Sequence, residues 1–149
     1  MNPSPATGGC QCGAVRYSIE GPLKGAHFCH CRMCQRAVGN VFAALVAAPK
    51  DAVTWTRGAP TIFASSDKAT RGFCATCGTP LTFAYNHSHH LNVTIGSLDE
   101  PKAWPIEMHY GVEGRLPWVK VCDGLPEEAT SDEAGAVLAD MISHQAETR

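Results

Sequence analysis

The chain contains the stretch RGFCATCGTPL at residues 71–81, where two cysteines are separated by two residues and followed directly by a glycine. The segment 71–85 predicts a β-hairpin with Cys74 and Cys77 at its tip. A turn around two metal-bound thiols directs backbone N–H groups onto the sulfurs, and Gly78 can adopt the positive φ that such a turn often requires. We therefore expect a metal ion to bind at the tip of this hairpin.

Seven of the eight cysteines fall into three clusters. The clusters are a first pair, Cys10 and Cys12, a triplet, Cys29, Cys31 and Cys34, and a second pair, Cys74 and Cys77. Four thiolates complete a tetrahedral zinc site, whereas three leave one coordination position open. Joining the two pairs leaves the triplet intact, while joining the triplet to one pair gives five and two ligands, which are not usual zinc sets. The sequence therefore predicts one closed, structural site and one open site.

The triplet has a spacing that suits a single metal ion. Cys31 and Cys34 are three residues apart, so one helical turn can present both sulfurs, and Cys29 can reach in from the preceding extended segment. Zinc held by three thiolates is a weaker Lewis acid than zinc held by three imidazoles, but it is suited to bind and keep deprotonated a fourth thiolate. A thiolate held beside a carbonyl leads to a hemithioacetal, so we expect a small thiol substrate.

Three alternatives for the triplet remain open. A histidine, His27, His30 or His109, could complete a second structural zinc site, and the protein would then be a non-catalytic zinc module for protein interaction. The triplet could instead carry redox chemistry. An iron–sulfur cluster would need a fourth thiolate, and only Cys122 remains, which we expect to be a buried small apolar residue.

Composition excludes several classes of protein. The 149 residues carry a formal net charge of −2 without a basic run, which argues against nucleic-acid binding. The N-terminus has neither a charged nor an apolar signal region, and the longest apolar stretch, residues 41–49, is too short to cross a membrane. We expect a cytoplasmic protein with no membrane partner, whose clustered thiols stay reduced and bind metal; this disfavours a disulfide relay in the closed site.

Apolar alternation and turn residues predict a mainly β protein, organised as a single domain over residues 1–149. The expected strands are 15–19, 25–29, 41–48, 53–57, 61–65, 91–95 and 118–121, with a short helix over 32–38. After Pro126 a capping box at residues 130–133 and an apolar face at helical spacing predict a C-terminal helix over about 130–147. This helix would pack on the sheet or on another subunit of a homo-oligomer.

Four ordered motifs give the chain a family resemblance. They are GCQCGAVRY at residues 9–17, CHCRMCQR at 29–36, RGFCATCGTPL at 71–81 and GSLD at 96–99. The set resembles the glutathione-dependent formaldehyde-activating enzyme family, which also includes centromere protein V, over about residues 8–126. The resemblance implies a β-tent fold of packed antiparallel sheets and two zinc ions. It assigns the structural zinc to the two cysteine pairs and the catalytic-type zinc to the triplet.

The resemblance also implies an activity. The founding reaction is a carbon–sulfur lyase reaction, the breakdown of S-(hydroxymethyl)glutathione to glutathione and formaldehyde or the reverse condensation. Family members carry a histidine after the GSLD segment, matched here by His109, and the motif DGLP, matched at residues 123–126. The segment after Pro126 departs from the family pattern.

Two further residues are candidates for the reaction. Arg71 could bind a substrate carboxylate through two hydrogen bonds, or could neutralise a thiolate site. His109 could shuttle a proton or donate a hydrogen bond from behind the site. The histidines His87, His89 and His90 lie in a polar segment that predicts a solvated loop, with an adventitious metal site as the alternative.

Overall fold

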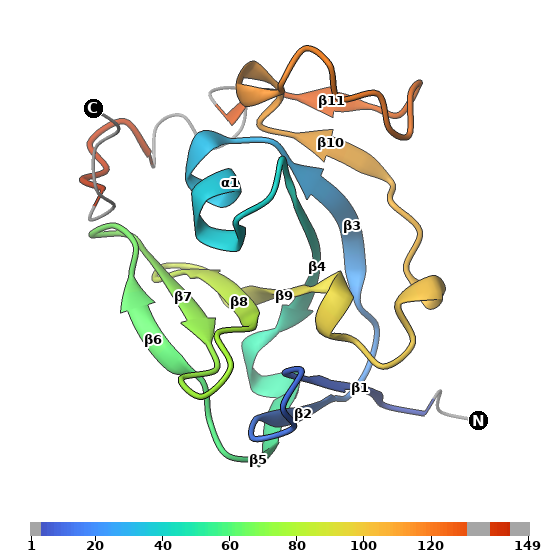
Figure 1. Ribbon diagram of the computed structural model, residues 1–149, viewed down its shortest axis with the longest axis vertical. Coiled ribbons are helices and arrows are strands. Elements are labelled where there is room, and N and C mark those ends of the chain that lie inside the picture. The colour runs from blue at the N-terminus through green and yellow to red at the C-terminus, as the bar shows by residue number, and fades with distance from the viewer. Residues whose placement is uncertain (1–3, 131–137, 144–149) are drawn as a thin grey trace.

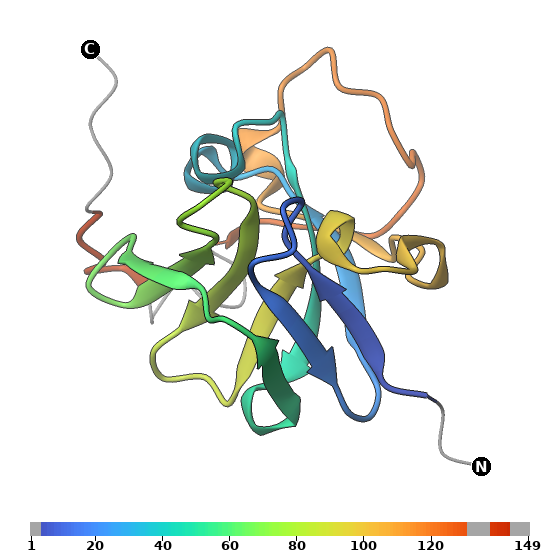
Figure 2. The same cartoon turned by 60° about the horizontal axis from the view of Figure 1, so that its bottom comes forward.

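The computed structural model describes residues 4–130 and 138–143 and shows a mainly β protein, as the sequence predicts. A three-stranded antiparallel sheet has the order β1-β2-β5, formed by β1 (Ala6–Gly9), β2 (Arg16–Ile19) and β5 (Val53–Arg57). The larger sheet has the order β11-β10-β3-β4-β9-β8-β7-β6, formed by β3 (Lys24–Cys29), β4 (Ala43–Pro49), β6 (Thr61–Ala64), β7 (Ala69–Phe73), β8 (Pro80–Tyr85), β9 (His90–Thr94), β10 (Met108–Tyr110) and β11 (Glu127–Glu128). Figure 2 shows the β1–β2 hairpin lying in front of the larger sheet.

The helix α1 (Arg32–Val38) follows β3 directly (Figure 1). The Sγ of Cys31 caps it by accepting a hydrogen bond from the backbone N–H of Cys34. Gly39 ends the helix at φ 65°, a left-handed conformation that glycine adopts without a Cβ clash. Four short 3-10 turns complete the regular structure of the described residues: η1 (Lys50–Ala52), η2 (Ile95–Ser97), η3 (Pro101–Ala103) and η4 (Val112–Gly114).

The main core lies between the two sheets. Tyr17 and Ile19 of the smaller sheet are buried together with Val46, Leu81 and Val93 of the larger sheet. Burial of such side chains is the main favourable term in folding. The same cluster includes two cysteines of the predicted closed site, so that site is part of the layer that joins the sheets.

The strands predicted around β2 to β9 are confirmed within one or two residues, and so is α1. The strand predicted over residues 118–121 is wrong, because these residues form a turn and a loop and Trp118 is 67% exposed. β10 pairs with β3 and β11 in parallel, so the sheets are not purely antiparallel. The predicted C-terminal helix over about 130–147 falls mostly on residues 131–137 and 144–149, outside the described residues. No helix of the described part is long and apolar enough to cross a membrane.

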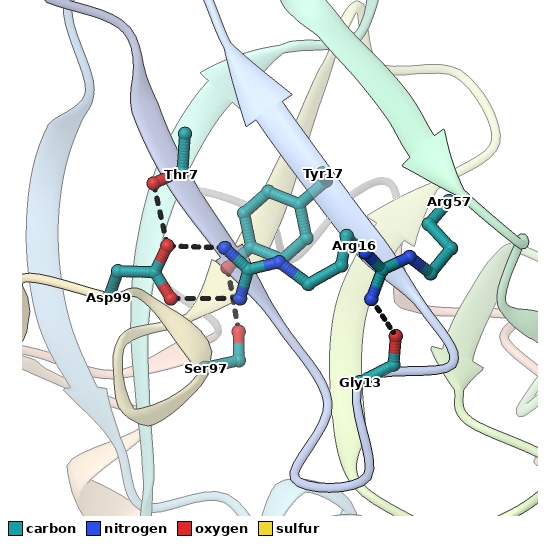
Figure 3. Close-up of polar contacts among 7 residues, drawn as sticks. All are labelled: Thr7, Gly13, Arg16, Tyr17, Arg57, Ser97 and Asp99. Atoms are coloured by element: carbon teal, nitrogen blue, oxygen red, sulfur yellow. Dashed lines mark hydrogen bonds and ion pairs between the residues drawn. The ribbon is translucent and has the colours of Figure 1, made fainter.

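A polar cluster attaches the β1–β2 hairpin to the segment that follows η2 (Figure 3). The carboxylate of Asp99 accepts hydrogen bonds from both terminal nitrogens of Arg16, at 2.9 and 2.5 Å, and from Thr7 Oγ1 at 2.6 Å. Beneath them, the hydroxyls of Tyr17 and Ser97 lie 2.7 Å apart, both buried. Hydrogen bonds from Arg16 and then Thr7 hold the pKa of Asp99 at about 2, and burial raises the pKa of Tyr17 to about 12. The cluster fixes the hairpin that carries Cys10 and Cys12.

We predict that Asp99→Asn lowers the free energy of unfolding by about 0.5 kcal/mol at pH 7, because the pair is partly exposed and solvent screens it. The folded pKa of Asp99 lies below its ordinary value of 3.8, so the stabilisation is complete above that value and is lost as the pH falls through about 2. Urea unfolding at pH 7 and pH 3 should show a smaller difference from the wild type at pH 3. The exposed Asp51→Asn is the control; a pH-independent difference for Asp99→Asn would contradict the prediction.

Candidate metal centres and the adjoining cavity

Two turns that are far apart in the sequence bring four thiols together. Cys10 and Cys12 lie in the turn between β1 and β2, and Cys74 and Cys77 lie in the turn between β7 and β8. Their sulfurs all lie within 4.8 Å of one another. Gln11 connects the turns, because its backbone N–H donates to Thr79 Oγ1 at 3.1 Å and its side-chain amide donates to the Cys77 carbonyl at 3.3 Å.

The spacing of these sulfurs fits a tetrahedral thiolate site. Zinc–sulfur bonds of about 2.3 Å at tetrahedral angles place two sulfurs about 3.8 Å apart. The Sγ atoms of Cys10 and Cys12 are separated by 3.5 Å, and those of Cys12 and Cys74 by 3.8 Å. A disulfide requires about 2.05 Å, and all these cysteines are free. The four-cysteine cluster therefore has the donor set and the dimensions of a closed metal site.

Backbone and hydroxyl groups point at the sulfurs of this cluster. The N–H of Val15 lies 3.3 Å from Cys10 Sγ, and Thr79 Oγ1 lies 3.2 Å from Cys77 Sγ. The Thr79 hydroxyl is the largest cause that lowers the pKa of Cys77 to about 5. Gly78 has φ 79° and donates its N–H to the Cys74 carbonyl at 2.8 Å, which confirms the expected left-handed turn. These contacts stabilise the thiolate form that a metal requires.

The triplet forms a second cluster at the junction of β3 and α1. Cys29 is the last residue of β3, Cys31 is the N-cap of α1, and Cys34 lies in the helix. The three sulfurs lie within 4.8 Å of one another, with 3.5 Å between Cys29 and Cys31. Within residues 4–130 and 138–143, no histidine nitrogen or carboxylate oxygen joins this group. Among the described residues, the cluster therefore offers three thiol ligands and no fourth.

Arg71 lies against this triplet. Its Nη2 is 3.5 Å from Cys34 Sγ, and its guanidinium carbon is 4.7 Å from the ring centre of Phe83. Hydrogen bonds from Cys29 and Cys31, followed by the charge of Arg71, hold the pKa of Cys34 well below its ordinary range. Of the two roles expected for Arg71, this contact favours neutralisation of a thiolate.

His109 lies behind the triplet in a chain of hydrogen bonds. Its Nε2 is 2.9 Å from the carbonyl oxygen of Cys122, and its Nδ1 is 2.8 Å from Nε2 of His30. Because a carbonyl only accepts, His109 carries its proton on Nε2, and His30 donates from its own Nε2. Both imidazoles are buried, and burial is the largest cause that lowers the pKa of His30 to about 4. Both nitrogens of His109 are thus engaged, which suits the role of a hydrogen-bonding residue behind the site.

Cys122 does not lie in the buried position that the sequence predicts. It is exposed instead of buried, and its φ of 48° is unusual for a residue other than glycine. Its carbonyl, not its thiol, makes the contact with the histidine chain. The prediction of a buried small apolar residue is wrong because the segment around it forms a surface loop.

A cavity of about 610 Å³ adjoins the triplet, a volume in the range of small-molecule sites. Its walls contain the three thiols, the charged residues Arg32, Arg71 and Glu128, and several aromatic and apolar side chains. The aromatic and larger apolar members are Met33, Leu45, Phe83, Tyr85, Met108, Tyr110, Leu138 and Met141. No local pattern in the sequence predicts these walls, although Phe83 and Tyr85 alternate on the strand after the second cysteine pair.

His87, from the predicted solvated loop, also lines the cavity and stacks on Tyr85, with 5.4 Å between ring centres. His89 and His90 are exposed. In the described part of the chain, these three histidines do not form a metal-ligand cluster. His87 is therefore a residue of the cavity wall.

The fold and the two thiol clusters define a mainly β protein with two sites suited to a soft metal ion. Residues 5–113 match the family described as glutathione-dependent formaldehyde-activating enzyme, and the chain belongs to that family. A Schizosaccharomyces pombe protein described as an uncharacterized lyase is 35% identical over 82 residues, which span 54% of this chain and 58% of that protein. A crystal structure of a Rhodobacter sphaeroides protein has a TM-score of 0.50 at 22% identity, covers 82% of this chain and 99% of that one, and supports the fold alone.

We predict that Cys74→Ser lowers the melting temperature by at least about 10 °C, because it removes one of the four thiols that meet between two distant turns and could hold a metal ion. Differential scanning calorimetry of the metal-loaded protein measures the change. Cys122→Ser removes the exposed thiol outside both clusters and should shift the melting temperature by no more than about 2 °C. Equal shifts for both variants would contradict a structural role for the closed cluster.

Proposed function

We propose that the protein is a zinc-dependent carbon–sulfur lyase that acts on a thiol adduct such as S-(hydroxymethyl)glutathione. The observation that carries the proposal is the cluster of three thiols in the wall of a cavity, without a fourth ligand from the described residues. The family of the chain and the lyase description of its yeast relative support the reaction class. The clustered free thiols fit a reducing compartment, and we propose the cytoplasm.

We further propose that each chain binds two zinc ions. Cys10, Cys12, Cys74 and Cys77 hold a structural zinc, and Cys29, Cys31 and Cys34 hold a catalytic-type zinc. When bound at the triplet, zinc supplies a soft cation that accepts a substrate sulfur and favours its thiolate form. Cys34 is fixed in the first turn of α1 and Cys29 at the end of β3, so rigid elements on both sides orient the open position.

In the lyase direction the carbon–sulfur bond of the adduct breaks and its electron pair stays on sulfur. The hydroxymethyl carbon becomes formaldehyde as its hydroxyl loses a proton. His27 lines the cavity with Nδ1 2.7 Å from the Gly25 carbonyl, so Nε2 is the nitrogen left to accept the hydrogen bond and then the proton of that hydroxyl. Arg71 offsets the negative charge of the triplet through its contact with Cys34.

A second candidate is a non-catalytic zinc module for protein interaction. The observation that favours it is the edge strand β6, where Ile62 and Phe63 are 56% and 44% exposed. An exposed apolar edge strand can pair with another chain, including a second copy of this one. This candidate does not account for the cavity beside the triplet.

We predict a stoichiometry of two zinc ions per chain in the wild type and one in Cys34→Ser, because two thiolates are too few for a stable zinc site. Atomic absorption after gel filtration measures the ratio. Cys122→Ser should retain two ions, since its thiol lies outside both clusters. A wild-type ratio of one, or a variant ratio of two, would remove the basis of the catalytic-type site.

We predict that the zinc-loaded protein binds glutathione in calorimetric titration and accelerates both formation and breakdown of its formaldehyde adduct, followed by ¹³C NMR exchange. Arg71→Met should lower kcat/KM at least about tenfold, because it removes the cation beside Cys34. Arg57→Met is the control, since Arg57 of β5 donates to the carbonyl of Gly13 in the β1–β2 turn and does not line the cavity. If the wild type neither binds glutathione nor exchanges the adduct, glutathione is not its thiol.

A further inference from the structure

The segment 138–143 is attached to the turn between β6 and β7. The backbone N–H of Asp67 donates to the Ile142 carbonyl at 3.1 Å, and the N–H of Ile142 donates to Asp67 Oδ1 at 2.8 Å. Lys68 forms an ion pair with Asp140, and Ser66 and Ser143 form an isolated antiparallel bridge. Figure 1 shows this segment in red beside the end of the β6–β7 hairpin. The contacts bring a part of the chain outside the family match to the edge of the cavity.

Within this segment, two side chains line the cavity. The N–H of Met141 donates to the Leu138 carbonyl at 3.0 Å, which closes a turn. Leu138 and Met141 are half-buried and line the cavity, whereas Asp140 and Ile142 are exposed. The segment therefore presents an apolar surface to the cavity and a polar backbone contact to the β6–β7 turn.

The other walls of the cavity are mainly apolar, with Arg32, Arg71 and Glu128 as their charged members. Phe83 and Tyr85 from β8 and Tyr110 from β10 line the same cavity as Leu138 and Met141. Of the cavity's arginines, Arg71 already contacts Cys34 and Phe83, and Arg32 donates to Gln35 Oε1 at 3.3 Å. A charged group placed against apolar walls loses hydration without a partner, whereas an apolar group gains free energy there.

We infer that Leu138 and Met141 are specificity-determining residues that favour a thiol with an apolar body over glutathione, whose arms end in charged groups. The inference rests on the proposed function, because it assumes that the triplet's metal binds the substrate sulfur. Both residues lie beyond residues 5–113, so the preference belongs to this chain and not to the part that defines the family. The thiol thus extends from the triplet towards the wall formed by 138–143.

The test is a calorimetric titration of the zinc-loaded full chain with benzyl mercaptan and with glutathione under anaerobic conditions. The wild type should bind benzyl mercaptan at least about tenfold more tightly. The double variant Leu138→Ala, Met141→Ala should lose at least about tenfold in affinity for benzyl mercaptan and less than about threefold for glutathione. Ile142→Ala, a truncation of an exposed side chain in the same segment, should leave both affinities unchanged.

A second variant, Met141→Glu, places a charge on the same wall. It should weaken the binding of benzyl mercaptan more than the binding of glutathione. An unchanged affinity ratio in both wall variants overturns the inference and leaves the proposed function standing, because the metal would still bind thiols. If the wild type binds neither thiol, both the inference and the proposed function are overturned. A change in the ratio caused equally by Ile142→Ala also overturns the inference, since that side chain is exposed and does not line the cavity.

Discussion

The meeting of two hairpin turns at four cysteines is the constraint on which the rest of the structure depends. The β1–β2 turn belongs to the smaller sheet and the β7–β8 turn to the larger one, so a metal ion held by these thiols would tie the two layers together. Hydrophobic burial between the sheets has no direction, whereas thiolate coordination fixes positions to a fraction of an ångström. The second cluster is built differently, because its three thiols come from one strand end and one helical turn.

Because the two clusters are built differently, the closed cluster can be rigid while the triplet is accessible from the cavity. The closed cluster is surrounded by backbone and side-chain contacts of both turns, including those made by Gln11 and Thr79. The thiols of the triplet line a cavity, whereas His30, between Cys29 and Cys31 in the sequence, is buried and pairs with His109. An exchangeable ligand can therefore reach the triplet without disturbing the joint between the sheets.

The sequence predicted most of the strands because alternation and glycine turns are local signals. It missed β1, whose residues Ala6–Gly9 carry little apolar pattern, and β10, a three-residue strand held by parallel partners distant in sequence. The cysteine clusters were grouped by ligand counting alone, and the sulfur positions agree with that grouping. The cavity walls could not be foreseen, because Tyr85, Tyr110 and Leu138 converge only through tertiary structure. Likewise, no local pattern places His30 against His109.

The histidine chain has a consequence for the charge balance of the protein. When both imidazoles are neutral, the proton on Nε2 of His109 is directed at the Cys122 carbonyl and its Nδ1 accepts from His30. Burial and then the charge of Arg115 lower the pKa of His30 to about 4, so His30 carries no charge at neutral pH. The positive charge beside the thiols of the triplet therefore comes from Arg71, whose Nη2 contacts Cys34 Sγ, and not from His30.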